Sequence, residues 1–164
     1  MFKDPLNKEK LLPYLAKNID GFSHLKNVKK FSIGQSNPTF LLETDTDSYV
    51  IRRKPDGPLL KSAHAIDREY RVQKALYDTP VPVAKMLHYC DDPSILGVEF
   101  YIMEFVDGVV YEDPALPSLA KNDRTKIYSE INRGLSSLHE VNIDAVGLTD
   151  FGAEGNYYER QISR

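Results

Sequence analysis

The chain has 164 residues, of which 41% are hydrophobic and 27% are charged, and its formal net charge is -3 at pH 7. This composition suits one ordinary domain with a buried core and excludes a disordered chain. The acidic balance argues against nucleic acid or an anionic membrane as a partner, and the sole cysteine, Cys90, excludes an internal disulfide and favours a cytoplasmic protein.

The first ten residues carry charges where a signal peptide would need an apolar run, and no stretch approaches the roughly 18 apolar residues of a membrane span. We therefore expect neither export nor membrane insertion. Leucines recur at near-helical spacing over residues 5–18 and predict a helix, with Asn7 as its N-cap. Because proline lacks a backbone N–H and clashes with the preceding turn, Pro13 is expected to kink this helix or end it early.

Three strand-like runs follow, over residues 25–33, 39–44 and 48–53. These runs alternate or consist of β-branched and aromatic residues, and Asp45-Thr46-Asp47 predicts a tight turn between the last two runs. The pattern predicts a three-stranded antiparallel meander.

A loop with two prolines and a glycine separates the meander from a predicted helix over residues 63–77. Two more strands are expected, over residues 83–89 and 98–104. The predicted order is therefore βββαββ.

Residues 105–117 have little periodicity and predict a linker. Beyond it, a helix over residues 123–141 carries one apolar stripe that needs a packing partner. The rest of the chain predicts loop and a first helical turn at 158–163, which supply that partner poorly. The predicted division is residues 1–104, residues 105–117 as linker, and residues 118–164 as the beginning of a second, incomplete lobe.

The loop between the first two strands contains Gly34, Gln35, Ser36 and Asn37. A phosphate group can be held by backbone N–H groups in such a loop, where glycine permits close approach. An ordinary hairpin turn explains the same residues, so both interpretations stay open at this point.

On the third strand, Val50 and Arg52 share one face, where an adenine and a triphosphate could lie. The following helix places Glu69 on a stripe with apolar residues, so its carboxylate needs a cation, and Arg52 is the natural partner. In the alternative, the opposite stripe of that helix is buried and Glu69 is merely solvated.

At the end of the fifth strand, Met103, Glu104 and Val106 lie where the strand runs out into the linker. Backbone groups left unpaired there could hydrogen-bond a planar base, through the Glu104 carbonyl and the Val106 N–H. Any strand end offers such groups, but the order of all four features is more specific than any one of them.

These features belong to longer motifs, which are Gly34 to Thr39, Val50 to Pro55, Ala63-His64 with Arg68 to Val72, Thr79 to Val83, and Phe100 to Glu104. On these motifs the chain resembles the aminoglycoside phosphotransferase and choline kinase-like family, whose fold is that of protein kinases. Within it, the chain is most similar to the phosphotransferase domain associated with acyl-CoA dehydrogenases of the 10 and 11 type. The resemblance implies an α+β fold with a protein-kinase-like N-terminal lobe, made of a five-stranded antiparallel sheet and one helix, followed by the start of a mainly helical C-terminal lobe.

The resemblance also implies roles for individual residues. Ser36 and Asn37 would lie at the nucleotide phosphates, Arg52 and Glu69 would form the ion pair of the fold, and 104–106 would form the adenine hinge. ATP and Mg²⁺ would be cosubstrates, with phosphate passed to a small-molecule hydroxyl, and a hydroxyacyl-CoA is the acceptor class that this branch suggests. Association with an acyl-CoA dehydrogenase domain is expected on the same ground.

The resembled family supplies its catalytic Asp and metal-binding Asn from a His-Gly-Asp-x-x-x-x-Asn loop. If His139 is taken as the loop histidine, Val141 and Val146 occupy the positions of the Asp and the Asn, so the match fails. Asp150-Phe151-Gly152 looks like a kinase metal motif but has no catalytic loop upstream, and we interpret it as a decoy. No catalytic or metal-binding residue is therefore assigned, the Mg²⁺ ligands are expected beyond Arg164, and the chain as written is expected not to catalyse. The alternative is a non-catalytic kinase-like module that binds a partner or regulates an attached enzyme.

Overall fold

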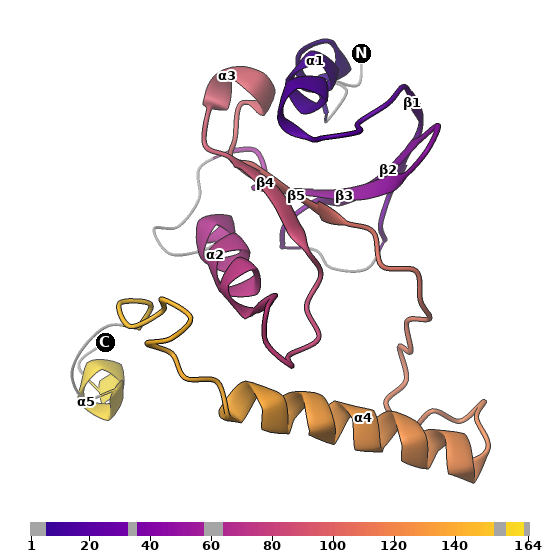
Figure 1. Ribbon diagram of the computed structural model, residues 1–164, viewed down its shortest axis with the longest axis vertical. Coiled ribbons are helices and arrows are strands. Elements are labelled where there is room, and N and C mark those ends of the chain that lie inside the picture. The colour runs from indigo at the N-terminus through magenta and orange to yellow at the C-terminus, as the bar shows by residue number, and fades with distance from the viewer. Residues whose placement is uncertain (1–5, 33–35, 58–63, 153–156, 163–164) are drawn as a thin grey trace.

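The computed structural model describes residues 6–32, 36–57, 64–152 and 157–162 (Figure 1). Within these residues the strands are β1 (Leu25–Lys30), β2 (Thr39–Thr44), β3 (Ser48–Arg53), β4 (Met86–Cys90) and β5 (Phe100–Glu104). The helices are α1 (Lys8–Asn18), α2 (Ile66–Leu76), α3 (Pro93–Leu96), α4 (Lys121–His139) and α5 (Tyr157–Ile162). This is the predicted α+β fold, with α3 as an addition that periodicity did not reveal.

The strands form one antiparallel sheet in the order β1-β2-β3-β5-β4. The predicted meander of β1, β2 and β3 is confirmed, and its tight turn is closed by Thr44, whose N–H and hydroxyl both donate to the Asp47 carbonyl. Because β5 pairs with β3, the chain crosses over through α2 and places β4 at the edge of the sheet (Figure 1).

Alternation along the strands divides the side chains between two faces of the sheet. One face meets α1 and forms the larger core, which includes Leu11, Leu15, Phe40, Leu42, Ile51, Phe100 and Ile102. The opposite face meets α2 through a smaller cluster of Ile66, Met86 and Tyr101. The two helices therefore cover opposite faces (Figure 1), and any polar residue on the α2 face lies between sheet and helix.

The early helix end expected at Pro13 is wrong, because α1 continues through this residue to Asn18. A proline removes one backbone donor from the helix, but Leu11 and Leu15 on either side of it are fully buried in the core. Packing of the two leucines therefore outweighs the local cost. Asn7 does occupy the N-cap position, yet it caps with its backbone carbonyl, which accepts from the Lys10 and Leu11 N–H groups, and not with its side chain.

Two stripes of α2 were candidates for the buried side, namely the one that carries Glu69 and the opposite one. The side of α2 that faces the sheet lies between them. Ile66 and Leu76 are buried, and Tyr70 packs against Tyr89 and Tyr101 of the sheet. Glu69 precedes Tyr70 on the same turn and is partly buried at the edge of this contact. The solvated alternative for Glu69 is therefore wrong.

The linker and α4 are more open than the sheet and α2. Among the residues described here, 105–117 contain no helix or strand, and α4 has no buried residue. The predicted apolar stripe of α4 is present but largely exposed, with Ile131, Leu135 and Leu138 on it. In the described ranges, no helix combines the length and the apolar character that crossing a membrane requires.

Candidate functional site

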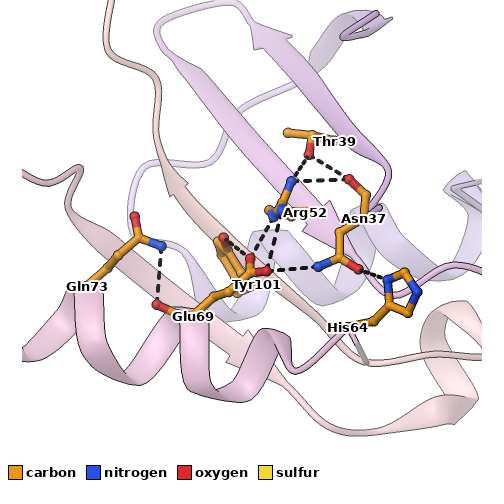
Figure 2. A network of polar contacts seen from close by, with 7 residues as sticks. All are labelled: Asn37, Thr39, Arg52, His64, Glu69, Gln73 and Tyr101. Atoms are coloured by element: carbon orange, nitrogen blue, oxygen red, sulfur yellow. Dashed lines mark hydrogen bonds and ion pairs between the residues drawn. The ribbon is translucent and has the colours of Figure 1, made fainter. Parts of the chain in front are cut away.

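An ion pair joins β3 to α2, as the sequence predicts (Figure 2). The Arg52 Nε donates to Glu69 Oε2 at 2.7 Å, and Nη2 lies 3.4 Å from Oε1. Both side chains are partly shielded, with 25% of Arg52 and 34% of Glu69 exposed. The contact is a side-by-side pairing of guanidinium and carboxylate, which is geometrically specific as well as attractive.

Most of the remaining N–H donors of Arg52 are bound by acceptors at the start of β2 and just before it. Its Nη1 donates to the Asn37 carbonyl at 3.2 Å and to the Thr39 hydroxyl at 2.9 Å. A guanidinium has five N–H groups, so these contacts and the ion pair leave one N–H of Nη2 without a partner among the described residues. Arg52 is thus fixed in place and keeps one donor and its positive charge for a ligand.

Glu69 is the acceptor that several donors share. Besides Arg52, Asn37 Nδ2 donates to its Oε1 at 2.9 Å, and the Tyr101 hydroxyl donates to its Oε2 at 3.2 Å. Partial burial by itself raises the pKa of Glu69, but the hydrogen bond and charge of Arg52, followed by the hydrogen bonds of Tyr101 and Asn37, outweigh it and hold this pKa below its usual value. Burial, and then the Glu69 charge, raise the pKa of Tyr101 to about 12, so its hydroxyl keeps the proton that it donates.

Asn37 turns its side chain toward α2 and not toward solvent. Only 2% of it is exposed, and its Oδ1 lies 2.9 Å from His64 Nδ1 while its Nδ2 meets Glu69 (Figure 2). Ser36, the preceding residue, is exposed and lines the neighbouring cleft. Of the two loop residues expected at the phosphates, therefore, Ser36 is open to a ligand and Asn37 is engaged with the protein.

A cleft of about 500 Å³ opens beside this network. The residues that line it are Ser36, Asn37, His64, Ala65, Arg68, Glu69, Val72 and Phe151. Glu69 and Asn37 thus belong both to the network around Arg52 and to the wall of an open cavity, and the cationic residue in that wall is Arg68.

The predicted base-binding residues divide between two places. Val50 and Met103 are paired across β3 and β5 on the same face as Arg52. Glu104 instead accepts the Lys85 N–H with its side chain and lines a separate cleft, and Val106 is 63% exposed on the linker. Gly34 and Gln35 lie outside the described residues.

Two arginines of α2, Arg68 and Arg71, bind the segment around Asp150. Arg71 forms an ion pair with the Asp150 carboxylate and donates to the Gly147 carbonyl at 3.0 Å. Arg68 donates to the Phe151 carbonyl at 2.6 Å and lies over its ring, 4.0 Å from the centroid. The Arg71 side chain holds the pKa of Asp150 below its usual value. In this structure the Asp150 carboxylate is therefore paired with Arg71 of α2.

Four members of the network in Figure 2 were missed by the sequence analysis, namely Thr39, Tyr101, His64 and Gln73, of which Gln73 donates to the Glu69 carbonyl at 3.2 Å. Thr39 and Tyr101 are the residues directly opposite Arg52 on β2 and β5, so only the strand register places them beside it. His64 belongs to a motif that was noted, but nothing in its spacing indicates that it meets Asn37.

The chain is similar to known proteins in both sequence and fold. Residues 27–164 match the phosphotransferase enzyme family. The chain is 47% identical, over 94% of its length, to a probable acyl-CoA dehydrogenase of Arabidopsis thaliana called IBR3, and 39% identical, over 96%, to human acyl-CoA dehydrogenase family member 11. A crystal structure of a protein assigned as an aminoglycoside phosphotransferase from Ralstonia eutropha superposes with a TM-score of 0.80, at 46% identity over 96% of this chain.

The relatives are much longer than this chain. It spans 20% of the Arabidopsis protein, 21% of the human protein and 45% of the solved chain. What is similar here is thus one part of a larger polypeptide in each relative.

Proposed function

Because the chain belongs to the phosphotransferase enzyme family, we propose that it is the ATP-binding part of an ATP-dependent kinase that acts on a small-molecule hydroxyl. The observation that carries this proposal is the fixed Arg52–Glu69 pair between β3 and α2, beside an open cleft. The other residues of the proposed site are assigned roles by where they lie relative to Arg52.

In this proposal, Arg52 contacts the nucleotide phosphates through its free N–H and its charge. A guanidinium stays protonated at all relevant pH values and suits phosphate oxygens, and here its orientation is set in advance by Glu69 and Thr39. Such preorganisation lowers the entropic cost of binding. Ser36, with Gly34 and Gln35, would cover the phosphates.

The adenine would lie against the sheet near Val50 and Met103, which share the Arg52 face. The backbone of 104–106 would then supply the hydrogen bonds to the base, since Glu104 uses its side chain for Lys85 and Val106 is exposed. Binding of the base would therefore depend on the backbone of 104–106 and not on a charged side chain there.

In the described ranges, no three His, Cys, Asp or Glu side chains come together as a metal site. We therefore propose that the Mg²⁺ ligands and the catalytic base lie outside the described residues. The division into residues 1–104, linker 105–117 and the start of a helical lobe at 118–164 is part of the same proposal, as is the cytoplasm as its compartment.

The acceptor proposed is a hydroxyacyl-CoA. Support comes from the relatives, which carry acyl-CoA dehydrogenase in their names and of whose length this chain spans between 12% and 21%. A kinase domain linked to a dehydrogenase domain would act on the same class of acyl-CoA, so association with such a domain is proposed too.

The second candidate is a non-catalytic module that binds a partner or regulates an attached enzyme. It is favoured by the scarcity of free donors on Arg52 and by the lack of a metal cluster among the described residues. Binding of nucleotide without phosphoryl transfer would support it.

Calorimetric titration of the full-length protein with ATP and Mg²⁺ tests the proposal, followed by phosphoryl transfer to a hydroxyacyl-CoA. Arg52→Ala is expected to weaken ATP binding about tenfold or more, because a hydrogen bond to a charged group contributes roughly 1.5 to 3 kcal/mol. Arg133→Ala is the matched control, since Arg133 pairs with Glu130 on the surface of α4. Failure of the wild-type protein to bind ATP at millimolar concentration would refute the proposal.

A further inference from the structure

Asn37 connects both members of the ion pair to a residue outside it. Its backbone carbonyl accepts from Arg52 Nη1 at 3.2 Å, and its side-chain amide donates to Glu69 Oε1 at 2.9 Å. The remaining polar atom of this buried side chain, Oδ1, lies 2.9 Å from His64 Nδ1. Figure 2 shows the resulting chain of contacts, His64 to Asn37 to Glu69 to Arg52.

The direction of each hydrogen bond in this chain follows from Glu69. An ionised carboxylate only accepts, so the Asn37 amide must present its NH₂ group to Glu69 and its oxygen to His64. The oxygen has no proton to give, so His64 Nδ1 must carry the hydrogen. The structure thus requires the Nδ1–H form of the imidazole, in either the neutral or the protonated ring.

His64 is itself held in an unusual backbone conformation. Its φ is +61°, in the left-handed region, and its carbonyl accepts the N–H of Ile66 at the start of α2. Among residues with side chains, those that adopt this region most readily are Asn, Asp and His. His64 therefore combines a hydrogen-bond donor at Nδ1, directly bonded to Cγ, with a backbone conformation that most other residues disfavour.

We propose that His64 is a positioning residue of the nucleotide site, whose Nδ1–H orients the Asn37 amide and thereby holds Glu69 against Arg52. The role of His64 rests on the proposed nucleotide binding, whereas the hydrogen-bond chain itself does not. If Asn37 lost its partner at Oδ1, the amide could rotate and present oxygen to the carboxylate, and Arg52 would lose part of its fixed orientation. In the part of the chain that the structure describes, no hydrogen bond or ion pair joins His64 to Arg52 or Glu69, so the proposed effect runs through Asn37.

Three substitutions of His64 separate the effect of its hydrogen-bond donor from the effect of its positive φ. Asn places Nδ2 at the same number of bonds from the backbone as His Nδ1 and tolerates positive φ, so His64→Asn keeps both features. His64→Gly tolerates the backbone but has no donor. His64→Gln has a donor one bond further out and is strained at this φ.

Titration of the full-length variants with ATP and Mg²⁺ measures the consequence. We expect His64→Gly to bind about tenfold more weakly than wild type, as for the loss of one partly buried hydrogen bond, and His64→Asn to bind within about threefold of wild type. A glycine variant with wild-type affinity, or an asparagine variant no better than glycine, would overturn the proposal.

Two further measurements need no nucleotide, so they separate a failure of this inference from a failure of the proposed function. Nitrogen NMR of the neutral imidazole should show the proton of His64 on Nδ1. A double-mutant cycle on the free energy of unfolding, with His64→Gly and Glu69→Gln, should be non-additive because Asn37 links the two residues. An Nε2–H tautomer, or additive losses, would contradict the hydrogen-bond chain even if ATP binds.

Discussion

Glu69 is the acceptor shared by Arg52, Asn37 and Tyr101, so its replacement by alanine is the sharpest perturbation of the site. The ion pair is about one third exposed and is discounted accordingly to about 1 kcal/mol. The hydrogen bonds from Asn37 and Tyr101 add roughly 1 kcal/mol each, less than for a fully buried charged acceptor because 34% of Glu69 is exposed. Since Asn37 stays buried with an unpaired NH₂ group, we expect a total loss of about 3 kcal/mol in the free energy of unfolding.

Urea unfolding followed by circular dichroism measures this loss, and a cycle with Arg52→Met apportions it. The double variant should lose at least about 1 kcal/mol less than the sum of the single losses, because each single variant leaves the other partner unmatched. Glu130→Ala is the control, as Glu130 forms an exposed pair with Arg133 on α4 and should change stability little. Additivity of Arg52→Met and Glu69→Ala within about 0.5 kcal/mol would refute the coupling.

The pH dependence of the stability of the wild-type protein follows from the direction in which the pKa of Glu69 is shifted. The pKa of Glu69 is lower in the folded protein than in the unfolded chain, so the unfolded chain takes up the proton first as the pH falls. The stabilisation is therefore complete above the unfolded pKa and is lost as the pH falls through the folded one. Glu69→Gln should lack this dependence, and a stability difference between the two proteins that stays constant down to acid pH would contradict the assignment.

Three other predictions concern packing and the network. Leu15→Ala should lower the free energy of unfolding by about 2 to 5 kcal/mol, because Leu15 is fully buried, and thermal unfolding checks this. Pro13→Ala should raise stability and helical signal, since it restores a donor inside α1; unchanged stability would mean that packing already absorbs the defect. Tyr101→Phe should lower stability by about 1 kcal/mol through the lost bond to Glu69, and a neutral result would show that Arg52 and Asn37 suffice for that carboxylate.

The comparison of sequence and structure is instructive at α1 and α2. The rule for Pro13 considered only the helix, whereas the outcome depended on how tightly Leu11 and Leu15 pack against the sheet. On α2, spacing favoured the stripe with Glu69 and left the opposite stripe as an alternative, and the sheet meets the surface between them. In both cases, the outcome depended on tertiary packing and not on the helix alone.

By itself, the sequence determined the order and type of the main elements, the turn at 45–47, and the need of Glu69 for a cation that Arg52 could supply. These follow from side-chain period and from the cost of an unpaired charge, which are local properties. Only the tertiary structure decided that Thr39 and Tyr101 flank Arg52, and that Asn37 turns inward to join His64 with Glu69. Those contacts depend on strand register and on the placement of α2 over the sheet, and hydrogen bonds require distances and angles that no linear spacing specifies.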